Sequence, residues 1–492
     1  DTAYFYVEDR YWDNLNPNQR TFLMSSVIAL GQEFDNNIYP KETQFWGAEP
    51  NPGIDGDPKI TIVLEDLVSG NGGYFDTRNE YFKNIASNSN EREMIFISAE
   101  AGSFAKIFLG HEFQHLISHN QKELLRKVQE DVWLNELRSE YSVSLLGYND
   151  NFYNSSLERR VSSFLENPSD SLTEWPNVSV DYAQVALFGQ YLAEQYGQSI
   201  LSETLQSPTV GIDSINQFLQ KHNYTEKFSN VFENWTVANY LNDINLDKRH
   251  GYQGNNLKNI HVIPEQSFLS YPTPYTFNRD SKSWQSAWYK YNFSSLPSDK
   301  AIKINYSPDY LVKVLYADNL GRVGVLNNPG HITNPGELSF VVLMPISEIE
   351  TSNFGSEEIP RTISLSINYV DNELAKPIVD GSLIKRPVEP ETYVVEGKYK
   401  RYLRPEIIQL YGHLDASKVI ELDDKIFNSY STANYVRSIN DKKVYAVWPD
   451  GTKHWLNMTG QYFTESGRDW GAIFTINESE FGAYKTGAEI TH

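Results

Sequence analysis

The spacing of apolar residues predicts a first part of the chain that mixes strands and helices. Residues 3–9 (AYFYVED) and 59–67 (KITIVLEDL) are short and rich in β-branched and aromatic residues, which is typical of strands. Residues 17–38 begin at a proline and carry apolar residues at helical spacing. From Ser103 to about residue 243 the pattern is mostly helical. We therefore expect an α+β domain over residues 1–250.

After about residue 255 the apolar pattern changes to a period of two. In residues 301–307 (AIKINYS) and 362–370 (TISLSINYV), apolar and polar residues alternate, as expected of strands with one face buried. Proline, glycine and asparagine residues separate such runs, which favours an all-β sandwich over residues 256–372. A proline-containing linker is expected to follow.

The last hundred residues repeat themselves. Two stretches, about 383–432 and 435–487, can be aligned with offsets of 52 to 54, which match Tyr393 with Tyr445, Gly397 with Gly451, and Phe427 with Phe481. This periodicity predicts a C-terminal α+β module of two homologous repeats over residues 380–492. Its tryptophans could form a platform for stacking sugars or could fill the module cores, and we favour the core for Trp448, Trp455 and Trp470.

Charge and composition narrow the range of partners. With 42 Lys and Arg against 64 Asp and Glu, the net charge of −22 disfavours nucleic acid and anionic membrane surfaces as partners. No apolar run is long enough for membrane insertion. Because cysteine is absent, any metal must be held by His, Asp or Glu. This composition suits a secreted bacterial protein, which we expect to be a monomer.

One segment carries the spacing of a metal site. Residues 111–115 read HEFQH, so His111 and His115 share one face of a predicted helix that begins near Ser103, with Glu112 between them. The alternative is a helix whose histidines are only surface or core residues. His119 repeats the spacing, but it lies about 12 Å along the helix from His111, too far to share one ion. We expect His119 to end the helix without a catalytic role.

A third ligand is expected in the helix that follows Asp131. Glu136 and Glu140 are four residues apart and therefore share a face of that helix. One carboxylate could bind the ion while the other accepts the free N–H of a ligand imidazole, although a solvated acidic face would show the same spacing. A metzincin arrangement is excluded, because Ser118 and Gln121 occupy the positions of its glycine and third histidine.

Together these motifs resemble those of the gluzincins, the zinc proteases with a thermolysin-like active site. HEFQH is followed 21 residues after its second histidine by the glutamate of NELRSE, and the flanking segments WLNE, NEREMIFISAE and DYAQVALFGQYLAEQYG are similar to those of the hyicolysin family of secreted bacterial neutral metalloproteases. The resemblance covers roughly residues 1–245. It implies a thermolysin-like zincin domain with a mixed sheet and a helical subdomain.

The resemblance also implies roles for individual residues. His111, His115 and Glu136 would bind one Zn²⁺ ion, Glu112 would be the general base, and Glu140 would accept a hydrogen bond from His111. GNGGYFD (residues 70–76) resembles the edge strand that binds the substrate backbone, so Tyr74 is a candidate substrate-binding residue. Members of the family tend to carry glycine at the position of Leu137, so a larger side chain there is expected to narrow the cleft.

The oxyanion of the tetrahedral intermediate needs a further donor, which gluzincins take from a Tyr or His on a later helix. We favour Tyr182 over the other candidates, which are Tyr191, Tyr196 and His222. Calcium is also conceivable, but the acidic segments GIDGDPK and ELDDK are too short to place a site.

The predicted function is a secreted zinc-dependent endopeptidase that uses a metal-activated water to hydrolyse protein or peptide substrates. One alternative is a zinc aminopeptidase, which is less favoured because no GxMEN-like segment precedes the helix. The other is a non-catalytic cell-surface binding protein, which would have no need of Glu112. The C-terminal repeats could bind a cell-surface or polymeric ligand.

Overall fold

The computed structural model describes residues 2–491 except 69, 335–336, 353, 373–377, 387–388, 415 and 423. Its N-terminal sheet is mixed and has the strand order β1-β2-β4-β3. Strands β1, β2 and β4 are parallel, and β3 pairs antiparallel with β4 at the edge. Their bounds are Ala3–Val7 (β1), Ile60–Glu65 (β2), Gly73–Phe75 (β3) and Met94–Ser98 (β4).

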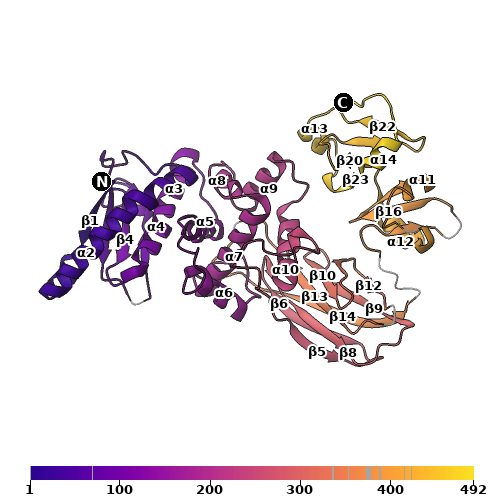
Figure 1. Ribbon diagram of the computed structural model, residues 1–492, viewed down its shortest axis with the longest axis horizontal. Helices are drawn as coiled ribbons and strands as arrows, with labels where there is room; N and C mark the ends of the chain where they lie inside the picture. Colours follow the sequence, from indigo (N-terminus) through magenta and orange to yellow (C-terminus); the bar gives the residue numbers. More distant parts are fainter. Residues whose placement is uncertain are drawn as a thin grey trace.

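Helices pack against this sheet and bury its apolar residues (Figure 1). They are α1 (Asp9–Asp13), α2 (Pro17–Glu33), α3 (Tyr39–Trp46) and α4 (Ala105–His119). The α2 helix starts where the sequence predicts, because Asn16 and Gln19 form a reciprocal capping box before Pro17. Helix α4 begins at Ala105, close to the prediction, but the N-cap predicted at Ser103 is wrong, since a 3₁₀ turn at Gly102–Phe104 leads into the helix.

The helical subdomain follows, and α7 runs through its core. Its helices are α5 (Val132–Leu145), α6 (Ser156–Glu166), α7 (Ser179–Tyr196), α8 (Ser199–Leu205), α9 (Gly211–Lys221) and α10 (Phe228–Leu241). Asp131 occupies the N-cap position of α5, although its side chain does not cap the helix. Gly189 on α7 leaves room for Leu137 on α5, since a β-carbon at Gly189 would lie 3.0 Å from that side chain.

Two facing sheets form the β-sandwich, with orders β11-β10-β13-β8-β5 and β12-β9-β14-β6. The strands of the first are β5 (Glu265–Leu269), β8 (Tyr289–Phe293), β10 (Val312–Asp318), β11 (Val323–Leu326) and β13 (Phe340–Ser347), joined by β7 (Gln285–Ser286). Those of the second are β6 (Tyr275–Ser281), β9 (Lys300–Ser307), β12 (Gly330–Ile332) and β14 (Arg361–Asp371).

Strand β13 is apolar on both faces because both are covered. Val341 and Leu343 face the sandwich interior, whereas Val342 and Met344 join the core of the helical subdomain. Trp284 also enters that core, against Phe228 of α10. The first sheet of the sandwich is therefore packed directly on the helical subdomain.

The C-terminal part contains two sheets of the same topology, with orders β18-β15-β16-β17-β19 and β23-β20-β21-β22-β24. The first half comprises β15 (Leu383–Lys385), β16 (Thr392–Glu396), β17 (Tyr399–Leu403), α11 (Pro405–Ile408), β18 (Ile420–Glu421), α12 (Asp424–Ser429) and β19 (Ser431–Thr432). The second comprises β20 (Tyr435–Ser438), β21 (Tyr445–Val447), β22 (Thr452–Trp455), α13 (Gly460–Glu465), β23 (Ile473–Ile476), α14 (Glu478–Ala483) and β24 (Lys485–Thr486).

Equivalent lysines occupy the two halves. Lys400 donates to the carbonyls of Phe427 and Tyr430, and Lys453 donates to those of Phe481 and Tyr484. Trp448 is 47% exposed, so the expectation that it fills a core is wrong. Residues 373–377 of the predicted linker lie outside the described residues. Among the residues that are described, none of the helices has the length and apolar character needed to cross a membrane.

Candidate metal centre

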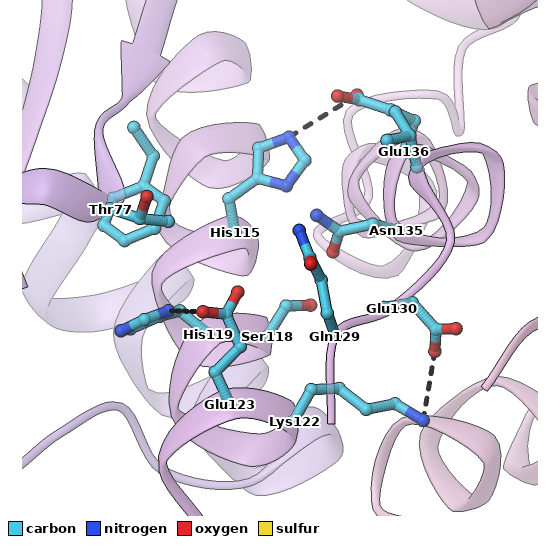
Figure 2. Close-up of a pocket in the computed structure, with 12 residues that line it drawn as sticks. Thr77, His115, Ser118, His119, Lys122, Glu123, Gln129, Glu130, Asn135 and Glu136 are labelled. Atoms are coloured by element: carbon cyan, nitrogen blue, oxygen red, sulfur yellow. Dashed lines mark ion pairs between the residues drawn. The ribbon is translucent and has the colours of Figure 1, made fainter. Parts of the chain in front are cut away.

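Helices α4 and α5 bring His111, His115 and Glu136 together. The Nε2 atoms of the two histidines are 3.3 Å apart. The Oε2 atom of Glu136 lies 3.2 Å from Nε2 of His111 and 3.4 Å from Nε2 of His115. Figure 2 shows His115 on α4 facing Glu136 on α5. Within the described part of the chain, these three residues form the group of potential metal ligands whose side-chain atoms lie close enough together to bind a single ion.

The triangle fits a zinc ion. Ligand atoms at about 2.0–2.1 Å in a tetrahedron lie about 3.3 Å from one another, which matches the separations of these atoms. The Oε2 atom of Glu136 is buried and has no hydrogen-bond partner among the described residues, as expected of an atom placed for a metal. Two imidazoles and one carboxylate also form a ligand set that catalytic zinc uses.

Ser139 orients the second histidine of the pair. Its Oγ lies 3.2 Å from Nδ1 of His115 and donates to Oε1 of Gln114 at 2.6 Å. We did not identify this residue from the sequence. Its position three residues after Glu136 on α5 places it on the same side of the helix, which is the signal that could have indicated it.

Glu140 lies between His111 and a half-buried arginine, Arg160. Its Oε1 atom is 3.6 Å from Nδ1 of His111, and its carboxylate accepts two hydrogen bonds from Arg160 of α6, at 2.8 and 2.6 Å. Burial lowers the pKa of His111, but its contact with the Glu136 carboxylate and the charges of the nearby glutamates raise it to about 9. A metal ion that binds this ring would therefore displace a proton.

Glu112 is buried beside the edge strand. The Cγ atom of Glu112 lies 3.1 Å from the place that a β-carbon of Gly73 would occupy, so the glycine lets β3 pass close to this carboxylate. Burial raises the pKa of Glu112, and the charges of His111 and His115 act in the opposite direction. A carboxylate with a raised pKa next to a ligand pair is suited to accept and return a proton.

Tyr182 is the oxyanion candidate that lies near this centre. Its ring centroid is 6.4 Å from that of His111, and the Arg160 guanidinium lies over its face. Its hydroxyl donates to Oδ1 of Asn177 at 2.8 Å, and burial, with the charges of the site glutamates, raises its pKa. The other candidates lie elsewhere: Tyr191 donates to the Arg249 carbonyl, Tyr196 packs on Tyr224, and His222 contacts Glu203.

The sequence also led us to expect that Tyr74 binds the substrate and that Leu137 narrows the substrate cleft. Tyr74 lies at the centre of the edge strand β3, where its ring stacks on Phe96 and its hydroxyl donates to Glu65. Leu137 does not narrow the cleft, because it is fully buried and faces Gly189 on α7. Neighbouring residues on a helix point about 100° apart, so the residue after Glu136 is directed away from the metal centre.

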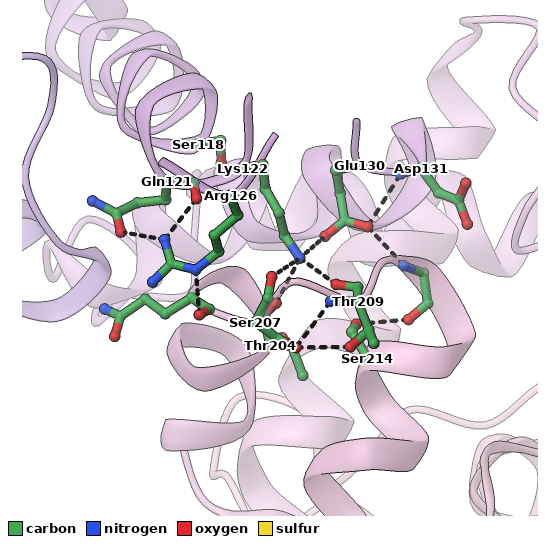
Figure 3. A network of polar contacts seen from close by, with 12 residues as sticks. Ser118, Gln121, Lys122, Arg126, Glu130, Asp131, Thr204, Ser207, Thr209 and Ser214 are labelled. Atoms are coloured by element: carbon green, nitrogen blue, oxygen red, sulfur yellow. Dashed lines mark hydrogen bonds and ion pairs between the residues drawn. The ribbon is translucent and has the colours of Figure 1, made fainter. Parts of the chain in front are cut away.

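A buried polar network fixes helices α4 and α5 relative to each other (Figure 3). Nζ of Lys122 donates to the carbonyls of Thr204, Ser207 and Thr209 at 2.6 to 3.1 Å and lies 3.0 Å from Glu130. Arg138 of α5 contacts the same carboxylate at 2.7 Å. These contacts join the π-helical turn after α4 and helix α5 to the end of α8 and the loop before α9.

The fold and the ligand set thus define a candidate metal centre of the HExxH type, with a glutamate as third ligand, on an α+β scaffold. Among curated proteins, the chain is similar to the neutral metalloprotease ShpI of Staphylococcus hyicus, with 31% identity over 222 residues. The match covers 39% of this chain and 48% of the relative, so the chain spans about half the length of that protein. This similarity supports a metalloprotease family and implies a metal cofactor.

The remaining comparisons add little. No protein-family model matches the chain. Among solved structures, the periplasmic lysozyme inhibitor PliG of Salmonella Typhimurium matches 22% of this chain and 99% of its own, with 9% identity and a TM-score of 0.17. A likeness of this size carries no argument about fold or function.

Proposed function

We propose that this chain is a secreted zinc-dependent endopeptidase with a thermolysin-like gluzincin active site. The observation that carries the proposal is the triangle formed by His111, His115 and Glu136 next to the buried carboxylate of Glu112. The similarity to a neutral metalloprotease supports it. Secretion agrees with the acidic, cysteine-free composition.

Each side chain of the site has its own role in peptide-bond hydrolysis. A bound zinc ion would supply Lewis acidity, lowering the pKa of a water molecule and polarising the scissile carbonyl. Glu112 takes a proton from the attacking water and passes it to the leaving nitrogen. Tyr182 stays protonated and turns from Asn177 to donate a hydrogen bond to the developing oxyanion. The edge strand β3, with Tyr74 at its centre, pairs with the backbone of the substrate.

The proposal extends to the C-terminal part. Residues 380–492 form two homologous repeats that bind a cell-surface or polymeric ligand and hold the enzyme near its substrate. Their common strand order and the equivalent Lys400 and Lys453 support a shared origin of the two halves.

Casein and a peptide blocked at both termini test the function together. The zinc-loaded protein should cleave both, lose activity with 1,10-phenanthroline, and recover it when zinc is added back. An aminopeptidase would leave the blocked peptide intact. Binding of one zinc ion without cleavage of either substrate would instead support a non-catalytic binding protein.

A further inference from the structure

A cavity of about 250 Å³ opens beside the candidate metal centre (Figure 2). It lies between the end of β3, the C-terminal half of α4 and the start of α5. His115 and Glu136 line both the cavity and the metal centre. A polypeptide held at the metal centre would therefore present a neighbouring side chain to this cavity.

The cavity lining is polar. Phe75 and Val132 are its apolar residues, and every other lining side chain carries a polar or charged group. An apolar side chain would remove water from these groups without replacing their hydrogen bonds, which is unfavourable. The lining thus favours a side chain that can form hydrogen bonds.

Two hydrogen-bond acceptors are available in the cavity. The Oδ1 atom of Asn135 is buried and lacks a hydrogen-bond partner within the described part of the chain. The Glu123 side chain is 32% exposed, and its carboxylate contacts Nδ1 of His119 at 3.3 Å and the Tyr81 hydroxyl at 3.4 Å. Figure 2 shows Asn135 and Glu123 extending from different helices, on either side of the cavity.

Glu123 is also the carboxylate whose charge remains available. Glu130 is already neutralised by Lys122 and Arg138 and accepts a further hydrogen bond from the backbone of Gly211. The contact with the His119 ring lowers the pKa of Glu123, so this group is ionised at neutral pH. The cavity therefore attracts a donor with positive charge.

The position of Glu123 selects for a long side chain. Side chains on a helix tilt towards its N-terminus, so the Glu123 carboxylate lies back beside His119. The Cα of His119 is about 6 Å along the axis from that of His115. Lysine and arginine combine the required length with positively charged donors.

We propose that this cavity is an acidic subsite that holds a lysine or arginine side chain of the substrate, next to the scissile bond. The proposal rests on the proposed endopeptidase function and names its substrate class. Glu123 and Asn135 are the residues that determine the specificity.

Matched peptides test the subsite. A peptide mixture first shows the position at which the zinc-loaded protein prefers a basic residue. Two peptides that differ only there, carrying arginine or its neutral isostere citrulline, then give the ratio of kcat/KM. We expect a ratio of about tenfold or more, which falls close to one in Glu123→Gln. The exposed Glu465→Gln, on α13, is the control and should keep the ratio. An unchanged ratio in Glu123→Gln, or no basic preference at any position, would overturn the proposal.

A measurement of peptide binding tests the subsite separately from the proposed endopeptidase function. The zinc-loaded Glu112→Gln protein should bind the arginine peptide about tenfold more tightly than the citrulline peptide in fluorescence anisotropy, and adding Glu123→Gln should abolish the difference. If the parent protein cleaves neither peptide but this difference is present, the endopeptidase function fails and the subsite stands. Equal affinities would overturn the subsite whether or not the protein is a protease.

Discussion

The hydroxyl oxygen of Ser139 lies 3.2 Å from Nδ1 of His115. Because Ser139 gives its own proton to Gln114, it can accept the proton of His115 Nδ1. The lone pair of that ring is then left on Nε2, the atom that faces Glu136. Ser139 therefore fixes the tautomer that metal binding requires, although it does not contact the metal position.

Replacing Ser139 with alanine should weaken zinc binding about 10- to 100-fold, because His115 loses the acceptor that orients it. Competition with a chromophoric chelator measures this affinity. Ser144→Ala is a matched control on the same helix, where the hydroxyl accepts hydrogen bonds from Asn149 and Gln190. Equal zinc affinities in the Ser139 variant and the parent would show that the hydroxyl does not orient the ring.

Tyr182→Phe should lower kcat about 10²- to 10³-fold while KM changes little, because the lost hydroxyl acts on charge that develops in the transition state. Tyr191→Phe, which removes a buried hydroxyl that donates to the Arg249 carbonyl, should leave kcat within a few fold. Steady-state kinetics on one blocked peptide measures both variants. If both lose activity alike, Tyr182 has no special role in the reaction.

Lys122→Met should reduce the free energy of unfolding by about 3 kcal/mol, because it leaves three carbonyls and the buried Glu130 carboxylate without their ammonium partner. The exposed Lys127→Met should change it by less than about 0.5 kcal/mol. Urea denaturation of the zinc-loaded proteins provides the comparison. A similar small change in both variants would mean that the network of Figure 3 contributes little to stability.

Glu42 gives a prediction that depends on pH. It is fully buried, and burial raises its pKa well above the usual value, with only partial opposition from Ser142. Above pH 6 the unfolded chain has lost this proton, whereas the folded protein keeps it up to its own, raised pKa. Over that range the glutamate destabilises the fold by about 1.4 kcal/mol more per pH unit. Glu42→Gln should remove this slope, so its advantage in urea denaturation should grow from pH 6 to pH 8. A constant difference would show that Glu42 is ionised in the folded protein.

The periodic spacing of apolar residues was sufficient to predict the helices and strands that have a clear pattern. Strand β2, helix α2 and strand β14 lie where the apolar spacing predicts them, because each has one consistently buried face. The spacing of His111 and His115 also indicated a shared helical face. That Glu136 rather than Glu140 faces both histidines was implied by the resemblance to gluzincins, since their spacing alone leaves the choice open.

Other contacts depend on tertiary packing that spacing does not encode. Arg160 reaches Glu140 from helix α6, and Asn177 accepts the hydrogen bond of the Tyr182 hydroxyl from the turn just before α7. His119 was expected to end its helix, and it is the last residue of α4, but a π-helical turn continues the chain and leaves it buried beside the cavity. Its surroundings could not be read from its place in the sequence.

The central claim is that Glu112 performs acid–base chemistry beside a zinc ion held by His111, His115 and Glu136. The most direct measurement is the rate of cleavage of a blocked peptide by the parent and by Glu112→Gln, each with its zinc content determined on the same sample. We predict one zinc ion per chain in both proteins and a rate at least about 10³-fold lower in the variant. Equal rates at equal zinc content would contradict the account.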